Sequence, residues 1–133
     1  MTDVDFLARC QSLAAVAAER HESPVGAVIA VDATIIGEGI EASKARGDIT
    51  CHAEVEAIRA AVKARGRDLS MATLYTTHEP CLLCSYVIRH HHIARVVIQH
   101  SVAHVGGVTS TYPILTATDV QVWGAPPLVT WVS

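Results

Sequence analysis

The chain has 133 residues, half of them hydrophobic, and a net charge of −3. This length and composition predict a single domain over residues 1–133 with a hydrophobic core, and every apolar run is too short or interrupted to span a bilayer. The acidic N-terminus lacks a signal-peptide pattern, so we expect a cytoplasmic protein with no membrane partner.

The first half of the chain predicts two helices separated by a hairpin. Apolar residues at three- and four-residue spacing predict a helix from about Asp3 to Arg20. A continuous apolar run at 25–31 predicts a strand buried on both faces, and a turn at 32–33 leads into a second, antiparallel strand at about 34–39. A further helix is expected from Thr50, its capping residue, to Arg65.

The second half alternates strands with one more helix. A strand is expected at 71–76, followed by a helix that begins at Pro80 and runs to about His91. Ile114-Leu115 suggests a short packed helix within the otherwise unassigned segment 101–118. Three further strands are expected at 94–99, 120–123 and 128–132. This alternation predicts an α/β fold with a mixed sheet and helices on both of its faces.

Two short motifs carry residues with metal chemistry. One is His52-Ala53-Glu54, and the other is Pro80-Cys81-Leu82-Leu83-Cys84. His52, Cys81 and Cys84 are zinc-type ligands. A structural zinc normally has four protein ligands, whereas a catalytic zinc keeps three and leaves one position for water. The set therefore predicts a catalytic site with Zn²⁺ as cofactor.

The spacing of these residues suits hydrolysis. Cys81 and Cys84 lie three residues apart in the first turn of a helix, on one face, where the helix dipole favours thiolates. Zinc lowers the pKa of its water, and Glu54 is placed to take that proton as general base and return it. Such a site replaces the exocyclic amine of an amidine-type ring by oxygen. Ala53 and Pro80, at the two helix starts, are expected to contact the substrate.

Three alternative interpretations concern metal-type side chains. The Cys81-x-x-Cys84 pair alone would suit a thioredoxin-like redox site, but that site has no use for His52 and Glu54. A structural zinc with Cys51 as fourth ligand would strain the turn, because Cys51 adjoins His52. The run His90-His91-His92 is rich in metal-type side chains, although a helix C-terminus favours histidine as a solvated cap.

The pair H-x-E and P-C-x-x-C resembles the cytidine deaminase-like superfamily of zinc deaminases. The resemblance extends from about Pro24 to about His104. It is strongest to the branch of guanine deaminases, fungal cytosine deaminases and tRNA adenosine deaminases, because Pro24-Val25-Gly26-Ala27-Val28, Gly37-Glu38-Gly39 and Glu79-Pro80-Cys81 match as well. The resemblance implies a three-layer α/β/α sandwich with a five-stranded mixed sheet, and usually a homodimer.

The resemblance also implies roles for single residues. It makes His52, Cys81 and Cys84 the zinc ligands and Glu54 the proton shuttle. Val25, in the matched strand, is expected at the substrate.

Three positions bear on substrate choice. The branch usually has Asn two residues after Gly-x-Gly, where this chain has Glu41. An ionised Glu only accepts hydrogen bonds, which predicts a donor-rich substrate edge unless Glu41 is a surface loop residue. His104 falls near the position of an aromatic that stacks on the base in fungal cytosine deaminase, so the alternatives for His104 are stacking on the base and facing solvent. Trp131, the last aromatic, is expected to help close the site, and its alternative roles are strand packing or a dimer contact.

These observations predict zinc-dependent hydrolytic deamination of a free nucleobase or related amino-substituted heterocycle of the guanine, isoguanine, cytosine or aminotriazine type. The acidic balance and the lack of a C-terminal basic helix favour a small-molecule base as partner and no nucleic acid. The alternative enzyme is a tRNA adenosine deaminase. Outside enzymes, the alternatives are a structural-zinc or a thioredoxin-like redox module.

Overall fold

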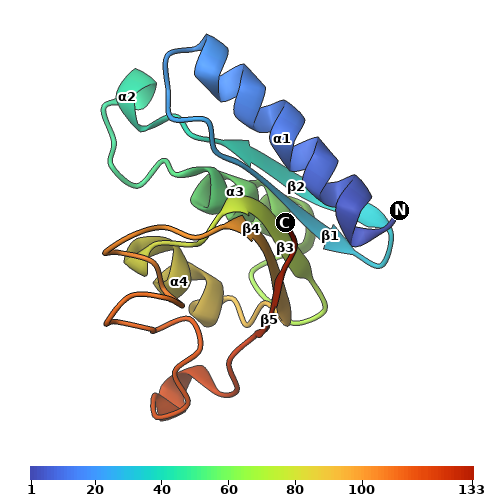
Figure 1. Ribbon diagram of the computed structural model, residues 1–133. Coiled ribbons are helices and arrows are strands. Elements are labelled where there is room, and N and C mark those ends of the chain that lie inside the picture. Colours follow the sequence, from blue (N-terminus) through green and yellow to red (C-terminus); the bar gives the residue numbers. More distant parts are fainter.

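The computed structural model describes residues 1–133 and contains a five-stranded mixed sheet with helices on both faces (Figure 1). The strands, in the sheet order β2-β1-β3-β4-β5, are β1 (Gly26–Val31), β2 (Thr34–Ile40), β3 (Thr73–His78), β4 (Arg95–His100) and β5 (Leu128–Trp131). The helices are α1 (Asp3–Glu19), α2 (Ser43–Arg46), α3 (Ala53–Arg65), α4 (Leu82–His90) and the 3₁₀ turn η1 (Gln121–Trp123). The predicted α/β sandwich is confirmed.

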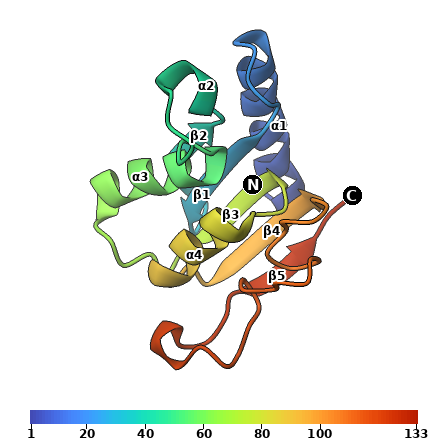
Figure 2. The same cartoon turned by 90° about the vertical axis from the view of Figure 1, so that its left-hand side faces the viewer.

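The central strands contribute to two separate cores. On β1, Val28 and Ala30 pack with α1, whereas Ala27 and Ile29 pack with α3 and α4. Successive side chains of a strand point to opposite faces, so a strand covered on both sides has to be apolar throughout. α1 therefore lies on one face of the sheet and α3 and α4 lie on the other (Figure 2). No helix combines the length and hydrophobicity that crossing a bilayer requires.

The strand directions bring several chain segments to one edge of the sheet. β1 runs antiparallel to β2 and to β3, whereas β3, β4 and β5 are parallel. α4 forms the crossover between β3 and β4. The start of β1 and the carboxyl ends of β3 and β4 therefore lie at the same edge, which is where open α/β sheets place their ligand sites.

Two glycines let α3 lie directly on the sheet. A Cβ at Gly37 would collide with the carbonyl oxygen of Ala57, and one at Gly39 would collide with that of Ala53. Only glycine fits so close an approach of helix to strand. This contact fixes the first turn of α3, which carries the first motif, against the sheet.

Both motif helices begin later than predicted. α3 begins at Ala53 instead of Thr50, because Asp48 Oδ1 accepts hydrogen bonds from the Thr50 N–H (2.9 Å) and hydroxyl (2.7 Å) and holds this segment in a turn. α4 begins at Leu82 instead of Pro80. His52 and Cys81 therefore precede their helices as N-cap residues, whereas Cys84 lies in the first turn of α4.

The segment 101–124 differs from its prediction. Ile114-Leu115 is not helical and 120–123 is not a strand, although η1 lies there. Arg89 of α4 explains both differences, since its guanidinium donates to carbonyl groups of the segment and so replaces the partners that a helix or strand would supply. The acceptors are the carbonyl oxygens of Ile114 (2.8 Å), Leu115 (3.3 Å), Ala117 (2.9 Å) and Gly124 (3.2 Å).

An ion pair between α1 and β4 makes the stability depend on pH. Arg95 donates to Asp3 Oδ1 at 2.9 Å and lowers the pKa of Asp3. A carboxylate with a lowered folded pKa stabilises the fold above its unfolded pKa of about 3.9 and loses that contribution as pH falls through the folded pKa. Asp3→Asn should cost about 1 kcal/mol at pH 7 and nothing below the folded pKa of Asp3. Urea unfolding between pH 2.5 and 7 measures this, with the exposed Asp119→Asn as control; a pH-independent difference would contradict it.

Candidate active site

A cavity of about 270 Å³ opens where the start of β1 meets the N-terminal ends of α3 and α4. Its position follows from the sheet edge described above. The side chains that line it come from both motifs and from four other segments of the chain. They are Ser23, Val25, Glu41, His52, Glu54, His78, Glu79, Cys81 and Val102.

Three side chains beside the cavity are placed to hold a metal ion. His52 Nδ1 lies 3.4 Å from Cys81 Sγ and 3.4 Å from Cys84 Sγ, and the three ligand atoms all lie within 4.8 Å of one another. In tetrahedral zinc with Zn–S of about 2.3 Å and Zn–N of about 2.0 Å, the ligand nitrogen and sulfur are about 3.5 Å apart. The donor set and its spacing fit Zn²⁺, as predicted.

The two thiols influence each other strongly. The hydrogen bond from Cys84, together with the Cys84 backbone N–H and nearby His52, lowers the pKa of Cys81 to about 5. The same hydrogen bond and burial raise the pKa of Cys84. A coordinating cation deprotonates a thiol outright, so two thiolates and an imidazole together compensate the charge of a divalent ion.

Glu54 is a buried carboxyl in the first turn of α3. Only 4% of it is exposed, and burial raises its pKa to about 8. Efficient general acid–base groups have pKa values close to the working pH. Glu54 shares the cavity with His52 and Cys81, so it can exchange a proton with a molecule bound beside the metal ligands.

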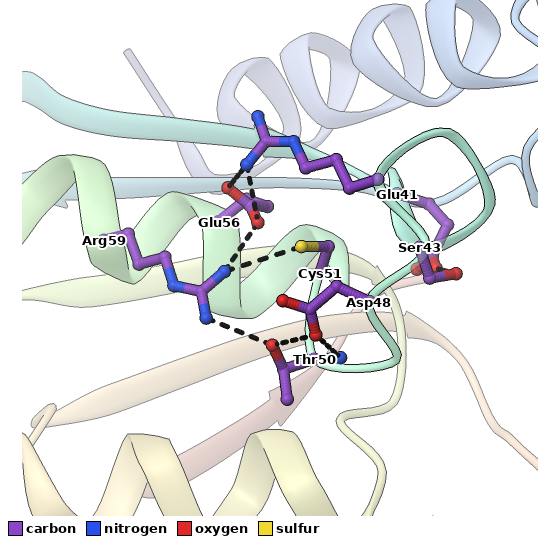
Figure 3. A network of polar contacts seen from close by, with 8 residues as sticks. Glu41, Ser43, Asp48, Thr50, Cys51, Glu56 and Arg59 are labelled. Carbon is purple, nitrogen blue, oxygen red and sulfur yellow. Dashed lines mark hydrogen bonds and ion pairs between the residues drawn. The ribbon is translucent and has the colours of Figure 1, made fainter.

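Cys51 belongs to a different cluster. Its thiol lies 3.6 Å from Arg59 Nη1, and Arg59 also donates to Thr50 (3.1 Å) and Glu56 (2.8 Å) (Figure 3). Cys51 is not among the residues grouped around His52, which disfavours a four-ligand structural site. The network ties the turn before α3 to the helix itself.

Glu79 fixes one wall of the cavity. Its carboxylate is 2% exposed and accepts hydrogen bonds from the N–H groups of Val102 (3.0 Å), Val108 (2.8 Å) and Thr109 (2.7 Å), and from the Thr109 hydroxyl (2.7 Å). Burial alone would raise the pKa of Glu79, but these hydrogen bonds outweigh burial and lower it. The loop 101–109 is therefore held to the start of the second motif by hydrogen bonds to an ionised carboxylate.

Replacing Glu79 by Gln should loosen this wall. Two of the four donors would then keep the amide oxygen as acceptor and the other two would face the amide NH₂, so we expect a loss of about 2–3 kcal/mol in unfolding free energy. Thr109→Val, which removes one bond only, should cost about 1 kcal/mol. Urea unfolding at pH 7 compares the two variants. Equal losses would mean that other contacts hold the loop.

Some of the predicted substrate residues line the cavity and others do not. Glu41 and Val25 line the cavity, and the Glu41 carboxylate accepts a hydrogen bond from the Ser43 hydroxyl at 2.5 Å. Ala53 and Pro80 are buried beside the metal ligands without lining the cavity.

His104 and Trp131 lie outside this cavity. His104 is exposed in the loop 101–109 with a left-handed φ of 68°. Trp131 is 43% exposed on the edge strand β5, opposite Ile98 of β4. Roles for both at the substrate remain predictions.

Other lining residues escaped the sequence analysis, namely Ser23, His78 and Val102. Ser23 and Val102 belong to no motif. His78 stands directly before Glu79-Pro80-Cys81, and a polar residue at the end of a strand that leads into a ligand motif is the signal that identifies it.

This fold and this cluster of three ligand side chains are those of a zinc-binding domain. Residues 1–100 match the family described as the cytidine and deoxycytidylate deaminase zinc-binding region, and the chain belongs to that family.

The chain is similar to several solved structures and curated proteins, among them the following three. A structure from a study of A-to-I editing by tRNA:A34 deaminases at the wobble position of transfer RNA is 30% identical, with a TM-score of 0.88 over 97% of this chain and 98% of that one. The guanine deaminase of Bacillus subtilis is 37% identical, with a TM-score of 0.73 over 76% and 66%. The tRNA-specific adenosine deaminase of Buchnera aphidicola is 44% identical over 77 residues, 57% of this chain and 48% of that protein. The chain thus spans about half the length of that curated relative.

These relatives correct one prediction. The prediction of a small-molecule base as partner, and of no nucleic acid, is wrong, because relatives from several bacteria are named for a tRNA substrate. Net charge misled because it sums over the whole molecule, whereas phosphate contacts need only local cations. A second cavity of about 530 Å³ shares Glu41 with the first one. Its lining includes four basic residues, Arg20, Arg46, Arg59 and Lys63, beside four acidic ones, Glu22, Glu38, Glu41 and Glu56.

Proposed function

We propose that this protein deaminates an adenosine of transfer RNA to inosine and releases ammonia. The observation that supports this most is the alignment of nearly the whole fold with the structure from the tRNA:A34 deaminase study, at a TM-score of 0.88 over 97% of the chain. The guanine deaminase structure aligns with 76% of the chain at a TM-score of 0.73.

The residues of the site have distinct roles in this reaction. His52, Cys81 and Cys84 would hold the zinc ion, which, when bound, lowers the pKa of a water towards about 7 and so supplies a nucleophile at neutral pH. Glu54 takes a proton from the water, passes it to the ring nitrogen beside the reacting carbon, and then assists the departing amine. A C–O bond forms, the C–N bond breaks, and ammonia leaves.

The size of the cavity restricts how RNA can bind. A volume of about 270 Å³ lies at the small end of ligand sites and accommodates one base. A base that reacts in such a cavity has to leave its stack, which costs least in a single-stranded loop. An anticodon loop is therefore a suitable substrate, with its backbone outside the cavity.

The experiment compares an anticodon stem-loop carrying adenosine at the wobble position with free adenine and free guanine. Inosine is measured by nuclease digestion and chromatography, and ammonia by a coupled assay. We expect inosine from the stem-loop and no ammonia from the free bases. Ammonia from free guanine, with an unchanged stem-loop, would contradict the proposal.

Glu41 is proposed to influence the choice of base. A carboxylate only accepts hydrogen bonds, and the unprotonated ring nitrogens of adenosine also only accept them, so the two groups cannot pair directly. Glu41→Asn supplies a donor and should raise kcat/KM on the adenosine stem-loop about tenfold or more, since one matched hydrogen bond to a buried group is worth about 1–3 kcal/mol. Glu38→Gln, a nearby carboxylate that pairs with Arg9 and does not line this cavity, is the control. Unchanged kinetics in Glu41→Asn would place Glu41 outside the substrate site.

The homodimer and the cytoplasmic location stay predictions. Sedimentation velocity at micromolar concentration tests the first, and a monomer would contradict it.

A further inference from the structure

We propose that His78 is a specificity-determining residue, which donates a hydrogen bond from Nε2 to an acceptor nitrogen of the substrate base and is held in the required tautomer by Thr77. The inference rests on the proposed function, because it concerns the same cavity. His78 is the last residue of β3 and lines the cavity together with His52, Glu54 and Cys81, and it also borders another cavity, beside α1.

The backbone of His78 is fixed on both sides. The Thr76 hydroxyl accepts a hydrogen bond from the His78 N–H (3.3 Å) and donates one to the His78 carbonyl oxygen (2.8 Å). Thr76 is fully buried. The imidazole is thus attached to a rigid strand end, which is a suitable support for a side chain that selects a ligand.

The hydrogen bonds of Thr77 determine the tautomer. The Thr77 hydroxyl accepts a hydrogen bond from the Gly26 N–H (3.2 Å) and lies 2.9 Å from His78 Nδ1. Thr77 is 2% exposed. If Nδ1 carried the imidazole proton, the hydroxyl would accept twice and its own proton would be buried without a partner, which is costly. The arrangement that satisfies all three groups has the hydroxyl donating to Nδ1, so the proton sits on Nε2.

The Nε2–H group is free to bind a ligand. No protein atom bonds it, and the only buried side-chain nitrogen or oxygen without a partner is Nε of Arg89, so His78 Nε2 is accessible. Burial, together with nearby His100, lowers the pKa of His78 and keeps the ring neutral at pH 7. His78 therefore offers a neutral donor.

This donor complements the other polar groups of the cavity. Glu41 and Glu54 present carboxyl groups, and the carboxylate of Glu79 is already occupied by four hydrogen bonds. The neutral side-chain donors that line the cavity are the Ser23 hydroxyl, which can rotate, and the His78 Nε2–H, which Thr77 holds in place. The ring nitrogens of adenine that do not react, N3 and N7, are acceptors and suit the His78 donor.

The first measurement needs no substrate. Long-range ¹H–¹⁵N NMR of the zinc-loaded protein distinguishes the two tautomers of each histidine. We expect the Nε2–H tautomer for His78, and a mixture of tautomers in Thr77→Val, which keeps the shape of the threonine but removes its hydroxyl. A wild-type protein with the proton on Nδ1 would overturn the proposal.

The second measurement identifies the acceptor. Stem-loops with 3-deazaadenosine or 7-deazaadenosine at the reacting position replace one ring nitrogen by C–H. We expect one of them to lose about tenfold or more in kcat/KM with the wild type, mainly through KM, and to lose less than about twofold with His78→Leu. His78→Gln, which keeps an N–H donor, should restore part of the loss, and Thr77→Val should add nothing in the His78→Leu background.

Two controls separate the possible failures. Zinc content and circular dichroism establish that each variant is folded. If His78→Leu retains the full penalty of both deaza stem-loops, His78 does not contact the base and the proposal is wrong. If the wild type leaves the adenosine stem-loop unchanged, the proposed function is wrong. The same comparison is then made with guanine and 7-deazaguanine. An equal loss of activity on 7-deazaguanine in the wild type and in His78→Leu would overturn the inference about His78 as well.

Discussion

Glu54→Gln should lower the deamination rate by about ten-thousand-fold while the fold and the zinc content remain unchanged. Positioned proton transfer contributes about a hundred- to ten-thousand-fold, and Glu54 is assigned more than one transfer per turnover, which puts the loss at the upper end. Gln has nearly the same shape but cannot accept and return a proton. A glutamine side chain at this buried position should therefore not destabilise the fold.

Glu56→Gln is the matched control for this variant. Glu56 lies in the same turn of α3, but its carboxylate pairs with Arg46 and Arg59 and does not line the active-site cavity. Single-turnover rates with the adenosine stem-loop compare the two variants. A near-normal rate in Glu54→Gln would assign the proton transfer to another group.

Arg89→Met should lower the free energy of unfolding by about 3–5 kcal/mol, which is more than we expect for Glu79→Gln or Asp3→Asn. Arg89 is 2% exposed, and burial lowers the pKa of its guanidinium. No carboxylate accompanies it; four backbone carbonyl groups of the segment 114–124 accept its hydrogen bonds. Methionine fills much of the same space but removes the donor from four carbonyl groups, of which that of Leu115 is buried and the others are part-buried. A buried acceptor left without a donor costs about 1–3 kcal/mol and a part-buried one less, offset by the relief of removing a buried charge.

Trp123 provides a local signal for the same variant. The Arg89 guanidinium lies 5.0 Å from the centroid of the Trp123 ring, and Trp123 Nε1 donates to His90 Nε2 at 2.7 Å. Urea unfolding and tryptophan fluorescence should both change in Arg89→Met, whereas the exposed Arg65→Met should change neither by much. Stability within about 0.5 kcal/mol of wild type would show that the segment folds without Arg89.

The sequence predicted those features that arise from local patterns. Apolar runs identified the strands, and the fold class is confirmed by the structure and by its structural relatives. The metal cluster was also predictable, since His52, Cys81 and Cys84 have zinc-type side chains at a recognisable spacing, and the structure brings them together.

The features that sequence analysis missed depend on contacts between distant residues. The path of 101–124 is fixed by Arg89 and Glu79, which lie outside the segment and leave no periodic signal within it. The start of α3 depends on Asp48, which competes for Thr50. His78 is recognised as a cavity residue only in the folded structure, where the end of β3 lies beside the starts of both motif helices.

X-ray absorption at the zinc K-edge tests the central claim most directly, because it counts sulfur against lighter ligands around the metal. For the zinc-loaded protein we predict one zinc per chain, with two sulfur ligands at about 2.3 Å and the remaining nitrogen or oxygen ligands at about 2.0 Å. Three or more sulfur ligands would mean that another cysteine, such as Cys51, completes a closed structural site. That result, or a chain that binds no zinc, would contradict the assignment of His52, Cys81 and Cys84 as the metal ligands of a deaminase.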